Sequence, residues 1–372
     1  MHPSCQTLGV THVTNMTPSN PSLPPTTVFI LGAGASKEAN LPVGSELTAQ
    51  IAGCLNFFHE RGALRSGDEL VLEALKIAAK TGAYGARPFT DFTHAGRRIA
   101  YAMPQAISID NYLDVHNEDK LVELCGKLAI VRTILRSEAN SAMKVHQTST
   151  GPTLSFTDTS KTYFSSLFQL ITENCKFVDL AARLRQVCFV VFNYDRCIEH
   201  YLHYAVRNYY DVSEREATEA LASLRVFHPY GAVGALPTQP NGTAVDLGAD
   251  PSPHQLLALA EQIKTFTEGT DPRSSDIIAI QNAMRTSARV VFLGFAFHKL
   301  NVKLLAPDLP SEQQTTALKV YGTAYGISTS DVELITNELA SRLSSSPLNV
   351  ALRRDLKCAD LFGEYWRSLS FT

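Results

Sequence analysis

Residues 26–48, TTVFILGAGASKEANLPVGSELT, decide the fold of this chain. The stretch begins as an apolar run rich in β-branched residues, stops abruptly in five small residues and then turns amphipathic. This order predicts a buried strand, a tight turn and the start of a helix. The small residues of the turn are Gly32, Ala33, Gly34, Ala35 and Ser36.

The turn has the composition of a phosphate-binding loop. Gly32 and Gly34 tolerate positive φ angles and have no Cβ, so backbone N–H groups can come close to a pyrophosphate. The full dinucleotide fingerprint has a third glycine, and Lys37 stands at that position here. On this motif alone, a tight turn that binds nothing is an equal alternative.

Composition limits the class of protein. The chain has 372 residues, of which 45% are hydrophobic, and this predicts one large α/β domain or two smaller ones. The net charge of −3 gives no general attraction for nucleic acid, so direct nucleic-acid binding is not expected. No apolar run is long enough to span a membrane, and the N-terminus lacks the pattern of a signal peptide. We therefore expect a soluble, cytoplasmic protein without membrane contact.

The cysteines indicate a reducing compartment. Their number is odd and none forms a CxxC pair, which is typical of reduced, mostly buried thiols and not of a disulfide framework. A structural zinc site and other metal centres are not expected, because no cluster of metal-ligating residues is present. The seven cysteines are Cys5, Cys54, Cys125, Cys175, Cys188, Cys197 and Cys358.

Helical patterns occupy much of the chain outside the first 25 residues. Residues 1–25 are rich in Thr, Ser, Asn and Pro, which predicts a flexible segment outside the fold. From about residue 46 to residue 186 the pattern is helical without a convincing strand, which predicts a helical insertion. The expected helices cover residues 45–59, with Ser45 as N-cap, and residues 68–81, 120–139, 163–171, 177–185, 254–268, 330–343 and 349–368.

Four more apolar runs predict strands after the insertion. They are continuous rather than alternating, as in strands that are covered by helices on both faces. Helical segments separate them, so the strands are expected to be parallel. The predicted fold is α/β, a Rossmann-like parallel sheet with a helical insertion. The runs are residues 187–192, 224–227, 289–293 and 319–323.

Polar or small residues follow each of these runs, and the carboxyl ends of parallel strands share one edge of a sheet. Asn193, Asp195, His228 and Gly294 are therefore expected to meet the glycine-rich turn at one pocket. A histidine can act as a base near neutral pH, an amide can orient a water, and a carboxylate can stabilise positive charge on a sugar. Cleavage at a nucleotide ribose fits this set better than acyl or phosphoryl transfer.

Each of these residues also has a structural alternative. Asn193 and Asp195 could cap a helix that begins near residue 196, and Asp110 could cap the helix that follows it. His228 precedes a proline and could be a turn residue. Phe295 is more typical of a core residue than of a ligand contact. His116, His298 and Asn301 are left without an assigned role.

The order of the motifs resembles the sirtuin family over about residues 26–326. GAGAS, FNYD, HPYG and FLGF each follow a predicted strand, as the corresponding motifs do in sirtuins. The match is most similar to bacterial sirtuin-like NADases of anti-phage defence, in which SID, FNYD, HxxG and GFxF recur. The resemblance implies a sirtuin-like NAD-binding catalytic domain at residues 26–330, with residues 331–372 as C-terminal helices that pack on it.

The resemblance also implies roles for individual residues. Asn193 would position the attacking water, Asp195 would support the ribose and His228 would act as base. Asp110, in the SID motif, is a further candidate for contact with NAD. The residues that would contact the phosphates, ribose and adenosine of NAD are Gly32, Ala33, Gly34, Ala35, Ser36, Gly294 and Phe295.

The sequence departs from protein deacylases of the same family. Deacylases follow the glycine turn with GIPDFR, whereas residues 41–46 read LPVGSE here, and the four-cysteine zinc module is missing. The expected activity is therefore hydrolysis of NAD⁺ to nicotinamide and ADP-ribose, which depletes cellular NAD⁺ in anti-phage defence. A non-hydrolysing NAD or ADP-ribose-binding assembly subunit is the alternative, and a deacylase is a weaker one. Control by homo-oligomerisation or by a helicase-type ATPase partner is expected, because an unregulated NADase is toxic.

Overall fold

A six-stranded sheet forms the centre of the computed structural model, which describes residues 26–149, 151–240, 242–269, 271, 273–307, 318–343 and 346–371. The expected flexible segment, residues 1–25, lies outside the described residues. The strands of the sheet are β1 (Thr27–Leu31), β6 (Val187–Val191), β7 (Arg225–Phe227), β8 (Arg289–Leu293), β9 (Lys319–Thr323) and β10 (Val350–Arg353).

The order of the strands in the sheet is β10-β9-β8-β1-β6-β7, and every neighbouring pair is parallel. The first strand lies in the middle, and the chain builds outward from it on one side and then on the other. This is the Rossmann order, so the predicted α/β class and parallel sheet are confirmed. Leu31 is level with Val191 and Leu293, and the three central strands therefore end at the same height.

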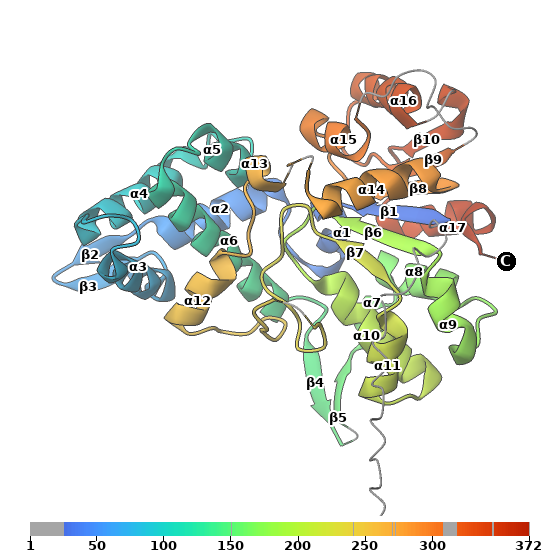
Figure 1. Ribbon diagram of the computed structural model, residues 1–372, viewed down its shortest axis with the longest axis horizontal. Helices are drawn as coiled ribbons and strands as arrows, with labels where there is room; N and C mark the ends of the chain where they lie inside the picture. The colour runs from blue at the N-terminus through green and yellow to red at the C-terminus, as the bar shows by residue number, and fades with distance from the viewer. Residues whose placement is uncertain are drawn as a thin grey trace, which may run out of the picture.

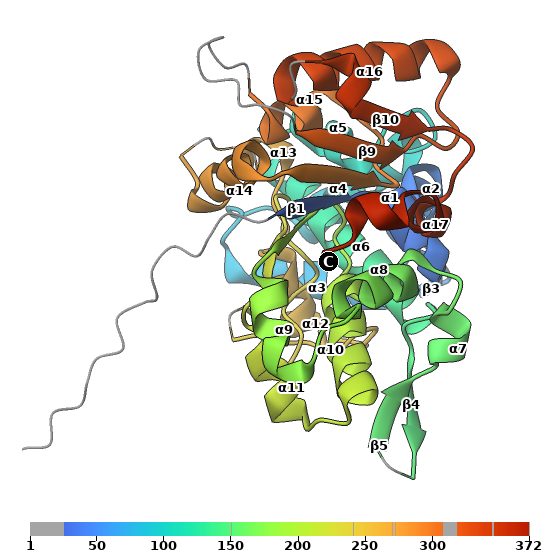
Figure 2. The same ribbon diagram turned by 90° about the vertical axis from the view of Figure 1, so that its right-hand side faces the viewer.

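Helices cover both faces of the sheet, and the central strands β1 and β6 are therefore buried along their whole length. Alternate residues point to opposite faces: Phe29 and Phe189 pack toward one layer, and Ile30 and Phe292 toward the other. Figures 1 and 2 show the two layers. One holds α8 (Tyr163–Thr172), α9 (Phe177–Leu184), α10 (Cys197–Tyr210), α11 (Glu214–Leu221) and α17 (Cys358–Leu369), and the other holds α14 (Ser275–Thr286), α15 (Lys299–Leu305) and α16 (Thr329–Leu343).

A second group of helices, here called the helical body, lies beside the sheet, on the left in Figure 1. It has a hydrophobic core of its own. Most of it comes from the chain between β1 and β6, but one helix arrives from much later in the sequence and packs against α3 and α6. The helical body comprises α2 (Gly44–Leu55), α3 (Glu69–Thr81), α4 (Phe89–Ala102), α5 (Ile109–Val115), α6 (Lys120–Ala139) and the late helix α12 (Pro253–Ala260).

Two β-hairpins contradict the expectation that residues 46–186 contain no strand. They pair β2 (Phe58–Glu60) with β3 (Ala63–Ser66), and β4 (Val145–Thr148) with β5 (Gly151–Leu154). The first hairpin turns at Arg61 and Gly62, which both have positive φ angles, as two-residue hairpin turns require. Its strands are largely exposed, so they lack the apolar run that marks a buried strand.

Several helix limits also differ from the expectation. Ser45 is not an N-cap: Val43 takes that position and its N–H donates to the carboxylate of Glu46, at 3.0 Å. The same helix ends at Leu55, because the chain enters β2. Residues 254–268 form two short helices, α12 and α13 (Phe266–Gly269), in place of one. The prediction of one helix at residues 349–368 is wrong in its first part. The chain there forms β10, which pairs with β9, and α17 begins only after it.

The helices expected at residues 68–81, 120–139, 163–171, 177–185 and 330–343 are confirmed as α3, α6, α8, α9 and α16, within one residue at each end. Short helical turns complete the described chain. They are α1 (Ala33–Ser36), η1 (Lys37–Ala39), α7 (Phe156–Thr159) and η3 (Pro347–Asn349).

Candidate functional site

The glycine turn, residues 32–36, closes tightly against the end of β8. The N–H of Gly32 donates to Leu293 O and that of Gly34 to Gly294 O, both at 3.0 Å. A Cβ on Gly32 would lie 2.5 Å from Gly294 O, so a side chain does not fit there. Because these two N–H groups serve the fold, they are not free for a phosphate. As first residue of α1, Ala33 has no intrahelical acceptor for its N–H, and it faces the main cavity.

The main cavity, of about 420 Å³, lies between the carboxyl ends of the central strands and the helical body. It sits where strand order reverses between β1 and β8, which is the position where open α/β sheets bind their ligands. Gly34, Ala35 and Gly294 lie behind its wall in the packed turn. The predicted site residues that line it are Gly32, Ala33, Ser36, Asp110, Asn193, Asp195 and Phe295.

Asn193, Ser36 and Asp195 form one hydrogen-bonded group in this wall. Asn193 Nδ2 donates to Gly32 O at 3.0 Å and to Ser36 Oγ at 2.8 Å. Since Gly32 O can only accept, the amide orientation is fixed and Oδ1 remains available as an acceptor. Burial raises the pKa of Asp195, and a hydrogen bond from Ser36 partly offsets this. These hydrogen bonds therefore fix the positions of the Asn193 amide oxygen and the Asp195 carboxylate relative to each other.

Asp195 also accepts from Cys197 N at 3.1 Å, at the start of α10. Asp195 therefore bonds to the start of the helix, as its structural alternative proposed, and it also lines the main cavity. Asp110 does not cap its helix, because Ser108 accepts from Asn111 N at 3.0 Å in that position. Instead the Asp110 carboxylate accepts from the hydroxyl of Tyr194. Burial raises the pKa of Asp110.

Aromatic and aliphatic side chains form the apolar part of the main cavity. Phe192 contacts Phe295 with ring centroids 5.0 Å apart and Tyr230 at 5.7 Å, and Phe266 lies 6.1 Å from Tyr230. Phe295 is both a core residue and a lining residue. Flat rings of this kind suit a planar ligand group.

Sequence reasoning missed several lining residues. Tyr230 follows His228 in the same loop, and its hydroxyl donates to Asn301 of α15. Asn301 and His298 both line the main cavity, whereas His116 stacks on Tyr112 in the helical body. A signal for Tyr230 was present, because it lies within the HPYG motif that follows β7.

His228 lies elsewhere: it lines a second cavity next to the main one, together with Glu199 of α10. Its Nε2 donates to Glu199 Oε1 at 2.7 Å and its Nδ1 faces Asn193 O at 3.3 Å. Both neighbours only accept, so both ring nitrogens carry hydrogen and the imidazolium form fits this geometry. Burial alone lowers the pKa of His228, but the Glu199 charge and the hydrogen bonds to Glu199 and Asn193 together outweigh burial and raise this pKa above its ordinary value.

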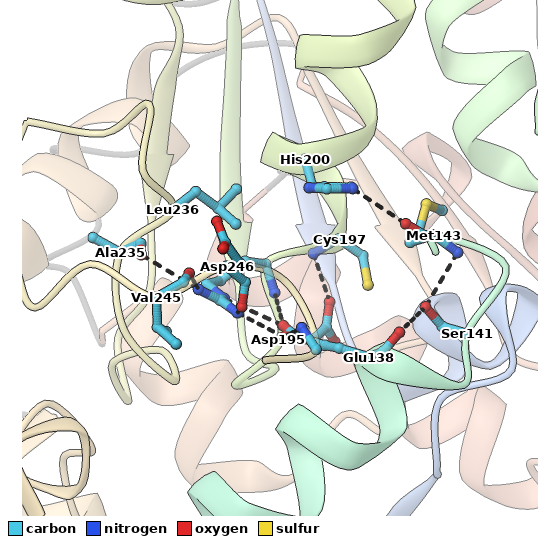
Figure 3. A network of polar contacts seen from close by, with 12 residues as sticks. Glu138, Ser141, Met143, Asp195, Cys197, His200, Ala235, Leu236, Val245 and Asp246 are labelled. Atoms are coloured by element: carbon cyan, nitrogen blue, oxygen red, sulfur yellow. Dashed lines mark hydrogen bonds and ion pairs between the residues drawn. The ribbon is translucent and has the colours of Figure 1, made fainter. Parts of the chain in front are cut away.

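A buried ion pair supports the start of α10 (Figure 3). Arg196 Nη2 lies 2.6 Å from Glu138 Oε2 of α6, and both side chains are at most 1% exposed. Arg196 also donates to the carbonyls of Val245 and Ala235, at 2.6 and 3.3 Å. The pair thus ties the helical body, the start of α10 and the loop after residue 231 together beneath the site.

No protein-family model, curated protein or solved structure matches this chain. Among the described residues, the structure contains no group of three or more His, Cys, Asp or Glu side chains placed to hold a metal ion. Within the same residues, every helix is too short or too polar to cross a membrane. The six described cysteines are free thiols, and Cys5 lies outside the described residues.

Proposed function

We propose that this chain is an NAD⁺ glycohydrolase, which cleaves NAD⁺ to nicotinamide and ADP-ribose. One observation supports this most: the glycine turn, Asn193 and Asp195 surround a single cavity where the strand order reverses. Dinucleotides bind at this point in open α/β sheets. The cavity of about 420 Å³ lies within the usual size range of cofactor sites.

The lining of the main cavity suits the parts of NAD⁺. The rings of Phe192, Phe295 and Tyr230 offer flat apolar surface to a nicotinamide or adenine ring. The N–H of Ala33 and the hydroxyl of Ser36 are polar groups on the side of the glycine turn. We therefore assign the phosphates and ribose to that side.

In the proposed reaction, the bond between ribose C1′ and the pyridinium nitrogen breaks, and its electron pair stays with nicotinamide. A water oxygen bonds to C1′ and one proton is released. Positive charge develops on the ribose, and the carboxylates of Asp195 and Asp110 supply the negative potential that stabilises it. Asn193 Oδ1 accepts a hydrogen bond from the attacking water.

The role of His228 differs from that of a base in direct contact with the water. Its imidazolium form cannot take up a proton, and it faces the second cavity. Through Nδ1 it holds the backbone of Asn193, which makes it a positioning residue in its charged form. It becomes a base only after losing a proton, at a pH above its raised pKa.

The direct test is incubation of the full chain with NAD⁺, with nicotinamide and ADP-ribose separated by chromatography. The proposal predicts the two products in equal amounts, at a rate that depends on the assembly state. NAD⁺ that stays intact at every protein concentration, with and without a helicase-type ATPase, would overturn it.

One observation favours a second candidate, an NAD or ADP-ribose-binding subunit without turnover. Both amide hydrogens of Asn193 are already bonded within the protein, and His228 is paired away from the main cavity. Stoichiometric binding of NAD⁺ without nicotinamide release would select this candidate. Depletion of NAD⁺ in anti-phage defence and control by homo-oligomerisation or a partner are further parts of the proposal, which rest on the sequence resemblance.

A further inference from the structure

The glycine turn leaves the pyrophosphate of a dinucleotide without its usual partners. The N–H groups of Gly32 and Gly34 donate to carbonyls at the end of β8 and just after it, both at 3.0 Å. Phosphates at such turns normally bind to backbone N–H groups of this kind. Because a pyrophosphate is negatively charged, a favourable site for it needs positive charge from another part of the cavity wall.

Acidic groups outnumber basic ones in the wall of the main cavity. Three carboxylates line it, those of Asp110, Asp114 and Asp195. Among the described residues of the lining, Lys299 is the only lysine or arginine, and His298 precedes it. Burial raises the pKa of Asp110, and the charge of His298 partly offsets this, so His298 already acts on a carboxylate. Lys299 forms no ion pair within the part of the chain that the structure describes, and its charge is therefore available to a ligand.

The segment that carries Lys299 begins against the glycine turn. A Cβ on Gly32 would lie 2.7 Å from Phe295 Cα, so the two backbones are in contact there. Phe297 has a φ of +54°, which is a strained conformation for a bulky residue. Its ring is held in the core, with its centroid 5.1 Å from that of Phe292 and 5.2 Å from that of Phe295. The chain thus turns so that Phe297 is buried while Lys299, two residues later, lines the main cavity.

We propose that Lys299 binds the pyrophosphate of the dinucleotide in the main cavity. This inference rests on the proposed function and deepens it, because it names the residue that holds the phosphates of NAD⁺. A lysine ammonium is a compact charge with three donors on a flexible four-carbon stem, and lysine is a common phosphate ligand. The side chain of Lys299 is exposed, so it can turn toward a phosphate beside the glycine turn. The site is therefore selective for ligands that contain a pyrophosphate.

The test is calorimetric titration of the full chain with ADP-ribose, which has the pyrophosphate but no nicotinamide to release. Lys299→Gln removes the charge and is expected to weaken binding about tenfold, near the low end for a charged hydrogen bond because Lys299 is exposed. Lys299→Arg keeps the charge and should retain most of the affinity. Lys303→Gln is the matched control, because Lys303 is an exposed lysine of the same helix outside the lining of the main cavity. It should bind ADP-ribose as the parent does.

Salt and turnover give two further readouts. Added NaCl should weaken ADP-ribose binding by the parent more than by Lys299→Gln, since salt screens the contact. In NAD⁺ hydrolysis, Lys299→Gln should raise KM and leave kcat unchanged. Equal ADP-ribose affinity of the parent and Lys299→Gln, or an equal loss in Lys303→Gln, would overturn the assignment even where nicotinamide is released. A tenfold loss in a chain that releases no nicotinamide would support Lys299 as a phosphate ligand and exclude only the hydrolysis.

Discussion

His228 and Glu199 form a close pair behind the main cavity, with Nε2 and Oε1 2.7 Å apart. The pair joins the loop after β7 to the first turn of α10, and His228 also contacts the backbone of Asn193. The two side chains are only 14% and 11% exposed, so solvent screens their charges weakly. Proton uptake at His228 is therefore linked to the geometry of Asn193.

The pair predicts how the rate of the proposed NAD⁺ hydrolysis depends on pH. Because His228 positions Asn193 in its charged form, the rate should fall as pH rises through a pKa above the ordinary histidine value. Glu199→Gln removes the charge that raises this pKa, so the falling limb should move to lower pH. Steady-state rates between about pH 5 and pH 9 measure the shift. Glu219→Gln, an exposed change on α11, should keep the parental profile, and identical profiles for all three proteins would exclude a role for the charged form of His228.

The same pair predicts a pH dependence of stability. Because folding raises the pKa of His228, this residue contributes to the free energy of unfolding. Its contribution is fully present at a pH below the unfolded-state pKa and is lost as pH rises through the folded-state pKa. The lowered pKa of Glu199 means that its part is lost as pH falls through the folded-state value. His228→Gln should therefore lower the free energy of unfolding more at about pH 6 than at about pH 9. Urea unfolding at both values measures the difference, and an equal loss at both would contradict the ion pair.

Gly294 controls the contact between β8 and the glycine turn. Its φ is +57°, and a Cβ there would lie 2.0 Å from Ala35 N. Gly294→Ala is therefore expected to lower the thermal midpoint strongly and to abolish NAD⁺ binding in any folded fraction. Gly53→Ala is the matched control, since a Cβ on Gly53 in α2 meets nothing within 4 Å. It should be neutral or stabilise by up to about 1 kcal/mol. Equal midpoints for the two variants would show that the tight contact is not required.

Removal of one partner from the buried pair of Arg196 and Glu138 is expected to destabilise the fold strongly. Glu138→Gln leaves the Arg196 charge buried and uncompensated, so the free energy of unfolding should fall by about 3–5 kcal/mol. Urea unfolding by circular dichroism measures this loss. Glu219→Gln, in an exposed ion pair with Arg215, should change stability by less than about 1 kcal/mol. A loss below about 1 kcal/mol for Glu138→Gln would show that the pair is dispensable.

The sequence predicted the sheet well because buried parallel strands are continuous apolar runs. Residues 187–192 and 289–293 stand out for that reason, and they became β6 and β8. The strand β10 did not stand out, because only four residues, none of them fully buried, pair at the edge of the sheet. The exposed hairpin of β2 and β3 was hidden for the same reason.

The candidate site was predicted only in part. The carboxyl ends of parallel strands share one edge of a sheet, and this predicted that Asn193 and Asp195 lie next to the glycine turn. The structure places them there. It could not assign His228 to a separate cavity, because that depends on its pairing with Glu199, 29 residues earlier in the chain. A signal for Glu199 existed, since it is the acidic residue in the first turn of the helix that follows Asp195. The hydrogen bond between Tyr230 and Asn301, 71 residues apart in the chain, had no such signal, although Tyr230 itself lies within the HPYG motif.

The measurement that tests the central claim most directly compares nicotinamide release from NAD⁺ by the parent and by Asn193→Ala. In the proposed reaction Asn193 supplies the oxygen that positions water, so its loss should slow release by at least about 100-fold while NAD⁺ binding persists. Asn117→Ala, at an exposed turn of the helical body, should retain the parental rate. Nicotinamide release by folded Asn193→Ala at the parental rate would contradict the account.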